Sequence, residues 1–130
     1  MTEPLYRIKA DLFKCLAHPI RIQVLEVLAA AGDRSTPVTR LLEVTECEAS
    51  QLSQHLALLR RSGLVTSSRT GNNVGYWLAE PLVAELLVVA RAFLLASLNP
   101  DSDRLRAAHA LPPLPGATPQ EMLDAIAAET

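Results

Sequence analysis

The 130-residue chain has few aromatic residues, only two cysteines and no long uninterrupted apolar run. Aromatic side chains make up 4% of the residues and hydrophobic ones 49%, so we expect an aliphatic, mostly helical core. The distant Cys15 and Cys47 exclude a disulfide framework and a CxxC metal site. The run over 82–98 is interrupted by Glu85 and Arg91 and is shorter than the roughly 20 residues of a bilayer span. With no signal-peptide apolar region, these absences predict a cytoplasmic protein without a membrane partner.

Acidic residues are absent from the stretch between Ala49 and Ala79, although the whole chain has a formal net charge of -2. The same stretch contains Arg60, Arg61 and Arg69, so positive potential is concentrated there. A polyanion would approach this part of the chain first. The charge pattern therefore favours DNA as a partner.

Helical spacing of apolar residues predicts a mainly α fold with one small β-hairpin. His18-Pro19 separates the first two helices, and Thr36 before Pro37 is the expected N-cap of a short third helix. Gly63 ends the preceding helix, and the turn-forming residues Thr70-Gly71-Asn72-Asn73 separate two strands. The expected helices cover residues 4–17, 19–31, a short segment after 36, 49–63 and 82–98, and the expected strands cover 64–68 and 74–79.

The helix over 49–63 has two different faces. Leu52, Leu56 and Leu59 share one stripe, which should pack on the core. The opposite stripe carries short polar side chains near its start and arginine at its end, which suit base edges and phosphates respectively. Since a short helix precedes it and a hairpin follows it, the segment predicts a helix-turn-helix with a wing.

Four sequence blocks resemble the ArsR/SmtB-type family of winged helix-turn-helix regulators. They are LAHPIR from Leu16, LSQHLALL from Leu52, SGLV from Ser62, and Gly71 with Tyr76 and Leu78. The resemblance implies a homodimeric repressor, released from an inverted-repeat DNA operator by a ligand. It places Ser50, Ser53 and Gln54 at base-reading positions, while His55 either packs on the scaffold or contacts phosphate. The full predicted DNA-binding set is Ser50, Gln51, Ser53, Gln54, His55, Arg60, Arg61 and Arg69.

The residues depart from the family pattern at both of its metal sites. The site on the helix after the wing would need ligands where this chain has Glu80, Leu82, Phe93 and Ala96. The site before the recognition helix would need cysteines within the stretch 40–43, which reads Arg-Leu-Leu-Glu. We therefore expect no metal at either site and no cofactor. In the wing, Gly75 and Trp77 also replace the residue types common in the family.

The helix over 82–98 is apolar on all sides, so one of its faces should meet a second copy of the chain. The helix over 4–17 is expected to lie in the same dimer interface. The predicted interface residues are Leu5, Ile8, Leu12, Leu86, Val89, Ala90, Phe93 and Leu94.

Composition changes after Asn99-Pro100, which predicts a domain of residues 1–99 and an extension of residues 100–130. A short helix over 102–110, a proline-rich linker and a final helix from Thr118 to about Ala128 are expected in the extension. Its role is open: it could brace the dimer, cover an effector or bind a partner.

Three alternatives to a simple metal-independent repressor follow from the same residues. Cys15 and Cys47 could form a thiol switch or, with His18 or His109, a soft-metal site, if their Cα atoms lie within about 7 Å. Both thiols otherwise pack as small apolar groups. A catalytic role would need a thiol paired with His18 or His55, without the loops and carboxylates typical of enzymes, so we predict no enzyme. A winged helix that binds protein instead of DNA is the third alternative, and the effector stays unknown.

Overall fold

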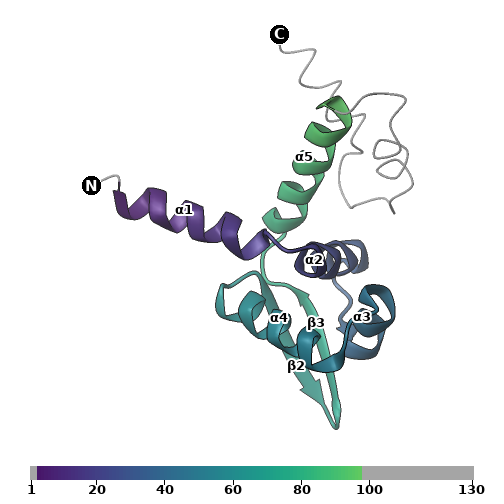
Figure 1. Cartoon of the computed structure of the whole chain (residues 1–130). Helices are drawn as coiled ribbons and strands as arrows, with labels where there is room; N and C mark the ends of the chain where they lie inside the picture. Colours follow the sequence, from purple (N-terminus) through teal and green to yellow (C-terminus); the bar gives the residue numbers. More distant parts are fainter. Residues whose placement is uncertain (1–2, 98–130) are drawn as a thin grey trace. The chain divides into compact units, whose positions relative to one another are not determined.

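The computed structural model describes residues 3–97 of the chain, which divides into two compact units, Met1–Glu80 and Pro81–Thr130. The first unit contains α1 (Glu3–Leu16), α2 (Pro19–Ala31), β1 (Thr36–Pro37), α3 (Val38–Thr45), α4 (Ala49–Arg61), β2 (Val65–Thr70) and β3 (Asn73–Leu78) (Figure 1). The described part of the second unit is α5 (Leu82–Ser97). The two helices expected after residue 100 lie outside the described residues, and the boundary predicted at residue 99 stays a prediction.

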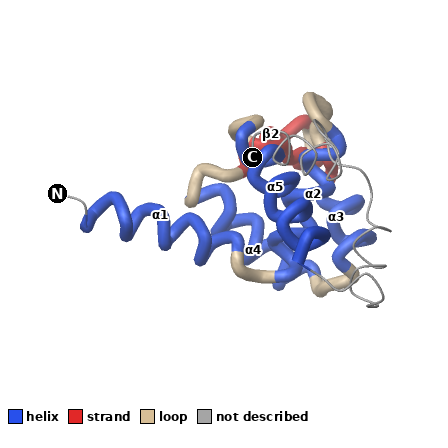
Figure 2. The backbone as a smooth tube through the Cα atoms, turned by 90° about the horizontal axis from the view of Figure 1, so that it is seen from above, coloured by secondary structure: helices blue, strands red, loops and turns tan. Residues whose placement is uncertain are grey.

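Three helices that contact one another, α2, α3 and α4, form the body of the first unit (Figure 2). Each contributes aliphatic side chains that are fully buried, as the helical spacing of the sequence predicts. The aliphatic, nearly aromatic-free core is confirmed within this unit. Its most buried side chains are Val24, Leu25, Leu28, Leu41, Leu52 and Leu59.

The predicted hairpin is present, but the sheet has a third strand that the sequence did not suggest. β2 and β3 are antiparallel and paired from Val65–Leu78 to Thr70–Asn73. β1 adds to the other edge of β3, with Thr36 opposite Tyr76. The prediction of Thr36 as the N-cap of α3 is therefore wrong, because its backbone is in a strand and Pro37 occupies the cap position.

Gly75 is explained by the close approach of the chain just before β1. A Cβ atom at Gly75 would lie 2.8 Å from Ser35 Oγ and 2.9 Å from Ser35 Cβ. Real Cβ atoms do not approach other heavy atoms so closely, so any larger residue here must displace Ser35. Glycine at this position thus leaves room for Ser35, which directly precedes β1.

We expect Gly75→Ala to lower the free energy of unfolding by about 1–3 kcal/mol through overpacking. Adding Ser35→Gly should restore part of that loss, because it removes both atoms that the new methyl group meets. Urea denaturation of the two single variants and the double variant gives the coupling energy. Additive losses would show that the steric contact does not set the stability of the sheet.

The buried and the exposed residues of α5 form two separate stripes along the helix. One stripe is buried and consists of Val83, Ala84, Leu87, Val88, Arg91 and Ala92. The other stripe is exposed or half-exposed, with Phe93 68% exposed. Its members include every α5 residue predicted for the dimer interface: Leu86, Val89, Ala90, Phe93 and Leu94.

The helix α1 is also apolar and exposed, except for its last turn, where Cys15 and Leu16 are buried. Ile8 is 64% exposed. The other large apolar side chains of the helix are also exposed, namely Leu5, Tyr6, Leu12 and Phe13. So many uncovered large apolar side chains on one helix are typical of a surface that a partner covers.

Within residues 3–97, no helix combines the length and the apolar character required to cross a membrane.

Candidate nucleic-acid interface

The helix α4 has the two faces that the sequence predicts. Leu52, Leu56 and Leu59 are buried against the unit, with exposed fractions of 3% or less. The polar side chains on the other side are exposed, namely Ser50, Gln51, Ser53 and Gln54. The helix is therefore anchored by its leucines and presents hydroxyl and amide groups to an incoming molecule.

The start of α4 is fixed by a capping box that the sequence analysis missed. The side chain of Glu48 accepts a hydrogen bond from the backbone of Gln51, and Gln51 Oε1 accepts one from the Glu48 backbone N–H at 3.4 Å. Such reciprocal bonds satisfy donors that a helix start leaves unpaired. The usual signature has Ser or Thr at the cap, so the glutamate at position 48 does not match it. Gln51 is thus a capping residue of α4, in addition to the DNA contact that the sequence predicts for it.

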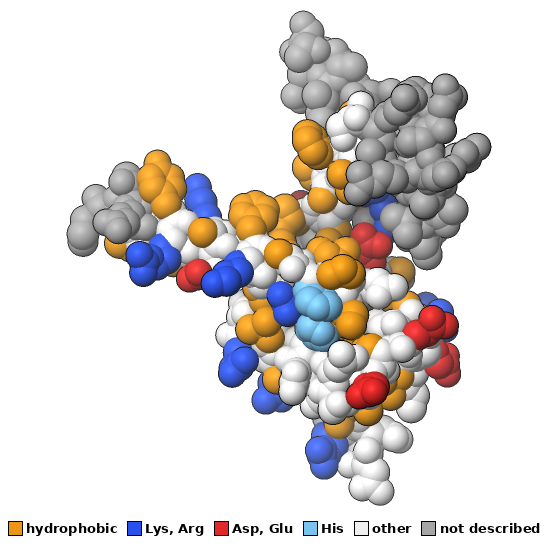
Figure 3. Space-filling model, viewed as in Figure 1, with side chains coloured by type: hydrophobic (Ala, Val, Ile, Leu, Met, Phe, Trp, Pro, Cys, Tyr) orange, Lys and Arg blue, Asp and Glu red, His pale blue; other side chains and the backbone are white. Residues whose placement is uncertain are grey.

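The C-terminal end of α4 contributes positive charge beside the hairpin. Arg60 Nη1 donates to Ser67 Oγ of β2 at 3.4 Å, while Arg61 and Arg69 are exposed. Gly63, with a φ of 78°, turns the chain from the helix end into β2. Figure 3 shows blue Lys and Arg side chains over α4 and at the hairpin end. Arginine side chains thus occur both at the end of α4 and on the hairpin, within the acid-free stretch.

The side chain of His55 faces the scaffold. Its ring lies against that of His18, with ring centroids 4.3 Å apart, and its Nδ1 lies 3.3 Å from Arg21 Nη1. Burial, followed by the neighbouring His18 and the Arg21 guanidinium, lowers the pKa of His55 below its usual value. Of the two roles that the sequence allows for His55, these contacts favour packing on the scaffold.

Comparisons with known proteins agree with this geometry. A family model described as "Helix-turn-helix domain" matches residues 16–68. Rv0081 of Mycobacterium tuberculosis, an uncharacterised HTH-type transcriptional regulator, is 48% identical over 99 residues, 75% of this chain and 84% of that protein. Its crystal structure superposes with a TM-score of 0.65 over 72% of this chain and 91% of that chain.

Two further solved structures are similar. Reduced HlyU from Vibrio cholerae has 34% sequence identity and a TM-score of 0.59, covering 66% of this chain and 87% of that chain. Mb0332 of Mycobacterium bovis, described as a homodimeric winged helix-turn-helix DNA-binding domain and a possible ArsR-family regulator, has 26% identity and a TM-score of 0.65, covering 75% of this chain and 88% of that chain. The chain belongs to the ArsR/SmtB-type family of winged helix-turn-helix transcriptional regulators.

In this ArsR/SmtB-type regulator the two cysteines lie near opposite ends of the recognition helix. Cys15 Sγ donates to Ser62 Oγ at 3.2 Å, just past the end of α4, whereas Cys47, 3.2 Å from Thr45 Oγ1, precedes its start. The 13 residues of α4 span roughly 20 Å, so the cysteine Cα atoms are much farther apart than a disulfide allows. A disulfide between Cys15 and Cys47 therefore cannot form within one protomer in this arrangement, and a thiol switch of another kind stays a prediction. The thiols also make these bonds to hydroxyl groups, not to the histidines that a catalytic pair would need.

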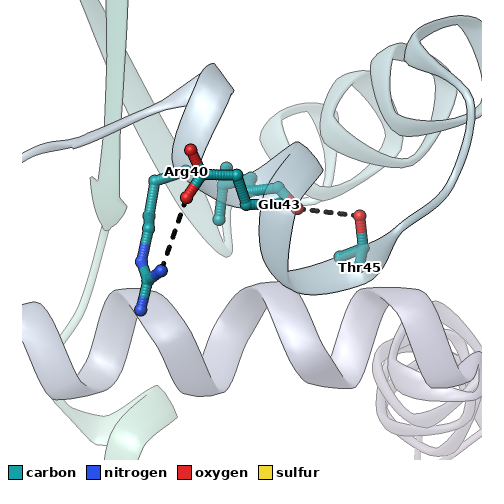
Figure 4. A network of polar contacts seen from close by, with 4 residues as sticks. Arg40, Glu43 and Thr45 are labelled. Carbon is teal, nitrogen blue, oxygen red and sulfur yellow. Dashed lines mark hydrogen bonds and ion pairs between the residues drawn. The ribbon is translucent and has the colours of Figure 1, made fainter.

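The position of the family's cysteine-based metal site is taken by other interactions in this regulator. On α3, Arg40 Nη1 and Glu43 Oε2 form an exposed ion pair at 3.6 Å, and Thr45 Oγ1 donates to the Leu41 carbonyl at 2.8 Å (Figure 4). Such an exposed pair adds little stability. Among residues 3–97, no three His, Cys, Asp or Glu side chains are grouped so that they could hold a metal ion.

Proposed function

We propose that this regulator binds an inverted-repeat DNA operator as a homodimer and represses transcription from it. The observation that carries this proposal is the exposed polar face of α4, which lies opposite a buried leucine stripe, with Arg60 and Arg61 at the helix end and Arg69 on the following hairpin. Hydroxyl and amide groups at this position reach base edges in a major groove. Such a regulator would act in the cytoplasm, where bacterial DNA is found.

The proposed contacts divide into two classes. Ser50, Ser53 and Gln54 would read bases, because they are short, polar, exposed and on the face of α4 opposite its leucines. Arg60, Arg61 and Arg69 would bind phosphates, because guanidinium groups at the helix end and hairpin lie beside the face that enters the groove. Gln51 and His55, which the sequence also suggested, have other contacts and would affect DNA binding indirectly.

Dimer formation is supported by the uncovered apolar surface. The exposed stripe of α5 and the exposed side chains of α1 are more apolar than a lone soluble protomer normally presents. Mb0332, which shares the fold, is homodimeric. A two-fold dimer would place two recognition helices in successive major grooves, about 34 Å apart. The operator should then consist of two half-sites related by inversion.

The test is selection of bound duplexes from a randomised library, followed by affinity measurements on the recovered site. We expect Ser53→Ala and Gln54→Ala to reduce discrimination at one or two base pairs, each by about 1–3 kcal/mol, because each removes hydrogen bonds to a base edge. Arg61→Ala and Arg69→Ala should weaken binding to all duplexes and lower the slope of log affinity against log salt by about 0.9 per lost contact.

Two results would contradict the proposal. If no duplex is enriched, the protein does not read sequence, and a protein-binding winged helix becomes the better explanation. If the serine, glutamine and arginine variants give the same profile across the library, the division between base and phosphate contacts is wrong. Glu43→Ala serves as the matched control, since this exposed residue lies on α3 and outside both proposed contact classes.

A further inference from the structure

Arg21 joins three helices of the first unit. Its Nε donates to the Cys15 carbonyl at 2.6 Å and its Nη2 to the Lys14 carbonyl at 3.4 Å, both at the end of α1. Its Nη1 lies 3.3 Å from His55 Nδ1 on α4, and the residue itself belongs to α2. One guanidinium thus caps the carbonyls that end the first helix and holds the recognition helix in place.

The contacts require both neighbouring histidines to be neutral. An arginine side chain has donors only, so His55 Nδ1 must accept, and its proton must be on Nε2. His18 Nδ1 likewise accepts from the backbone N–H of Ile20 at 3.1 Å, as the N-cap of α2. Protonation of either ring would replace an acceptor by a donor and abolish that hydrogen bond.

We propose that Arg21 is the positioning residue of the recognition helix, and that the Arg21–His55 contact, beside His18, is lost and specific DNA is released when the His55 imidazole takes up a proton. The inference rests on the proposed function, since it concerns the helix that reads the operator. Arg21 acts through His55 and the end of α1, without itself contacting DNA. The contacts that hold α4 in position therefore depend on pH.

The surroundings of His55 set the direction in which pH changes the stability of the folded arrangement around it. The charged or titratable groups facing it are His18 and Arg21 of the α2 region, and α1 reaches it through the two carbonyls bound to Arg21. No acidic residue occurs on α4 itself to stabilise an imidazolium. Because the pKa of His55 is lowered on folding, the unfolded chain binds the proton more readily. The stabilising effect of the neutral ring is complete above the unfolded pKa of 6.5 and is lost as pH falls through the folded-state pKa.

The experiment measures affinity for the duplex recovered by the wild type, at several salt concentrations and from about pH 7.5 to about pH 5.5, a range that brackets histidine titration. Wild-type affinity should fall on acidification, by at most about tenfold per pH unit for each proton taken up. The double variant His18→Asn, His55→Gln keeps an acceptor at both positions but cannot titrate there. Its ratio of affinities between the two pH values should be close to one. His109, which both proteins retain, is the internal control for other histidines.

Arg21 is tested by two substitutions. Arg21→Ala should lower affinity at about pH 7.5 by roughly tenfold or more, as expected for loss of hydrogen bonds from a charged donor, with the salt slope unchanged. Arg21→Lys should lose nearly as much, since an ammonium cannot reach both carbonyls and His55 together. Circular dichroism melts establish that the variants fold, and the double histidine variant tests the Arg21–His55 contact without altering Arg21.

Several outcomes would overturn the inference. A salt slope reduced in Arg21→Ala and retained in Arg21→Lys would make Arg21 a phosphate contact. Wild-type affinity that rises on acidification would mean that the histidines bind phosphate directly. Acid sensitivity that persists in the double variant would place the titrating group elsewhere. Absence of any sequence-specific binding by the wild type at neutral pH would instead refute the proposed function itself.

Discussion

The substitution Phe93→Asp should convert the dimer into monomers and reduce operator affinity to the non-specific level, a loss of about 10³-fold or more. Phe93 is 68% exposed in the single chain and belongs to the exposed apolar stripe of α5. A carboxylate at the centre of the proposed interface would be buried without a partner on dimer formation, which is costly. Because a monomer offers one recognition helix, it cannot contact both half-sites at once.

Sedimentation at about 1 µM protomer, a concentration at which only tight dimers persist, measures the first effect. The wild type should sediment at twice the protomer mass of 14.1 kDa, and Phe93→Asp at the protomer mass. Phe93→Leu is the matched control, since it keeps an apolar side chain at the same position and should stay dimeric. A wild type that sediments as a 14.1 kDa species, or a dimeric Phe93→Asp variant, would refute the proposed interface.

The sequence was informative wherever a structural property depends on neighbours along the chain. The opposite faces of α4 follow from Leu52, Leu56 and Leu59 recurring at helical spacing, and the structure confirms them. The same holds for the break at His18-Pro19 and for the hairpin around Gly71. These features are fixed by local backbone preferences and by periodicity, both of which can be read from one sequence.

Features that depend on residues distant in sequence could not be predicted. Thr36 looks like a helix cap, and only its pairing with Tyr76 of β3 makes it a strand residue. Arg21 and His55 are separated by 34 positions, and no spacing rule connects them. The requirement for glycine at position 75 likewise depends on Ser35, which is 40 positions away in the sequence. In each case tertiary packing selects one of several conformations that the local sequence permits.

The same limit applies to the thiol hypothesis, which required a distance that the sequence cannot give. Cys15 and Cys47 flank α4, so the length of that helix separates them. The hydrogen bond from Cys15 to Ser62 nevertheless connects the end of α1 to the end of the recognition helix, close to the Arg21 contacts. The first helix is therefore coupled to α4 through two adjacent contacts. A change in the packing of α1 would therefore alter the position of α4 and of its exposed polar face.

The leucine stripe of α4 provides the second large expected effect, this time on stability. Leu59→Ala should lower the free energy of unfolding by about 2–5 kcal/mol, because the side chain has an exposed fraction of 0% and its removal leaves a cavity. Leu58→Ala is the matched control, since it makes the same change in helix propensity at the adjacent, half-buried position. Its loss should be clearly smaller.

Urea denaturation of both variants at one fixed protomer concentration measures the difference, since dimer formation would make apparent stability depend on concentration. Equal losses at the two positions would show that α4 is not anchored by this stripe. If the losses differ as expected, DNA binding can be compared at a temperature where all three proteins are folded. A cavity beneath α4 should then weaken specific binding more than non-specific binding, because base contacts depend on the position of the helix whereas phosphate attraction tolerates small displacements.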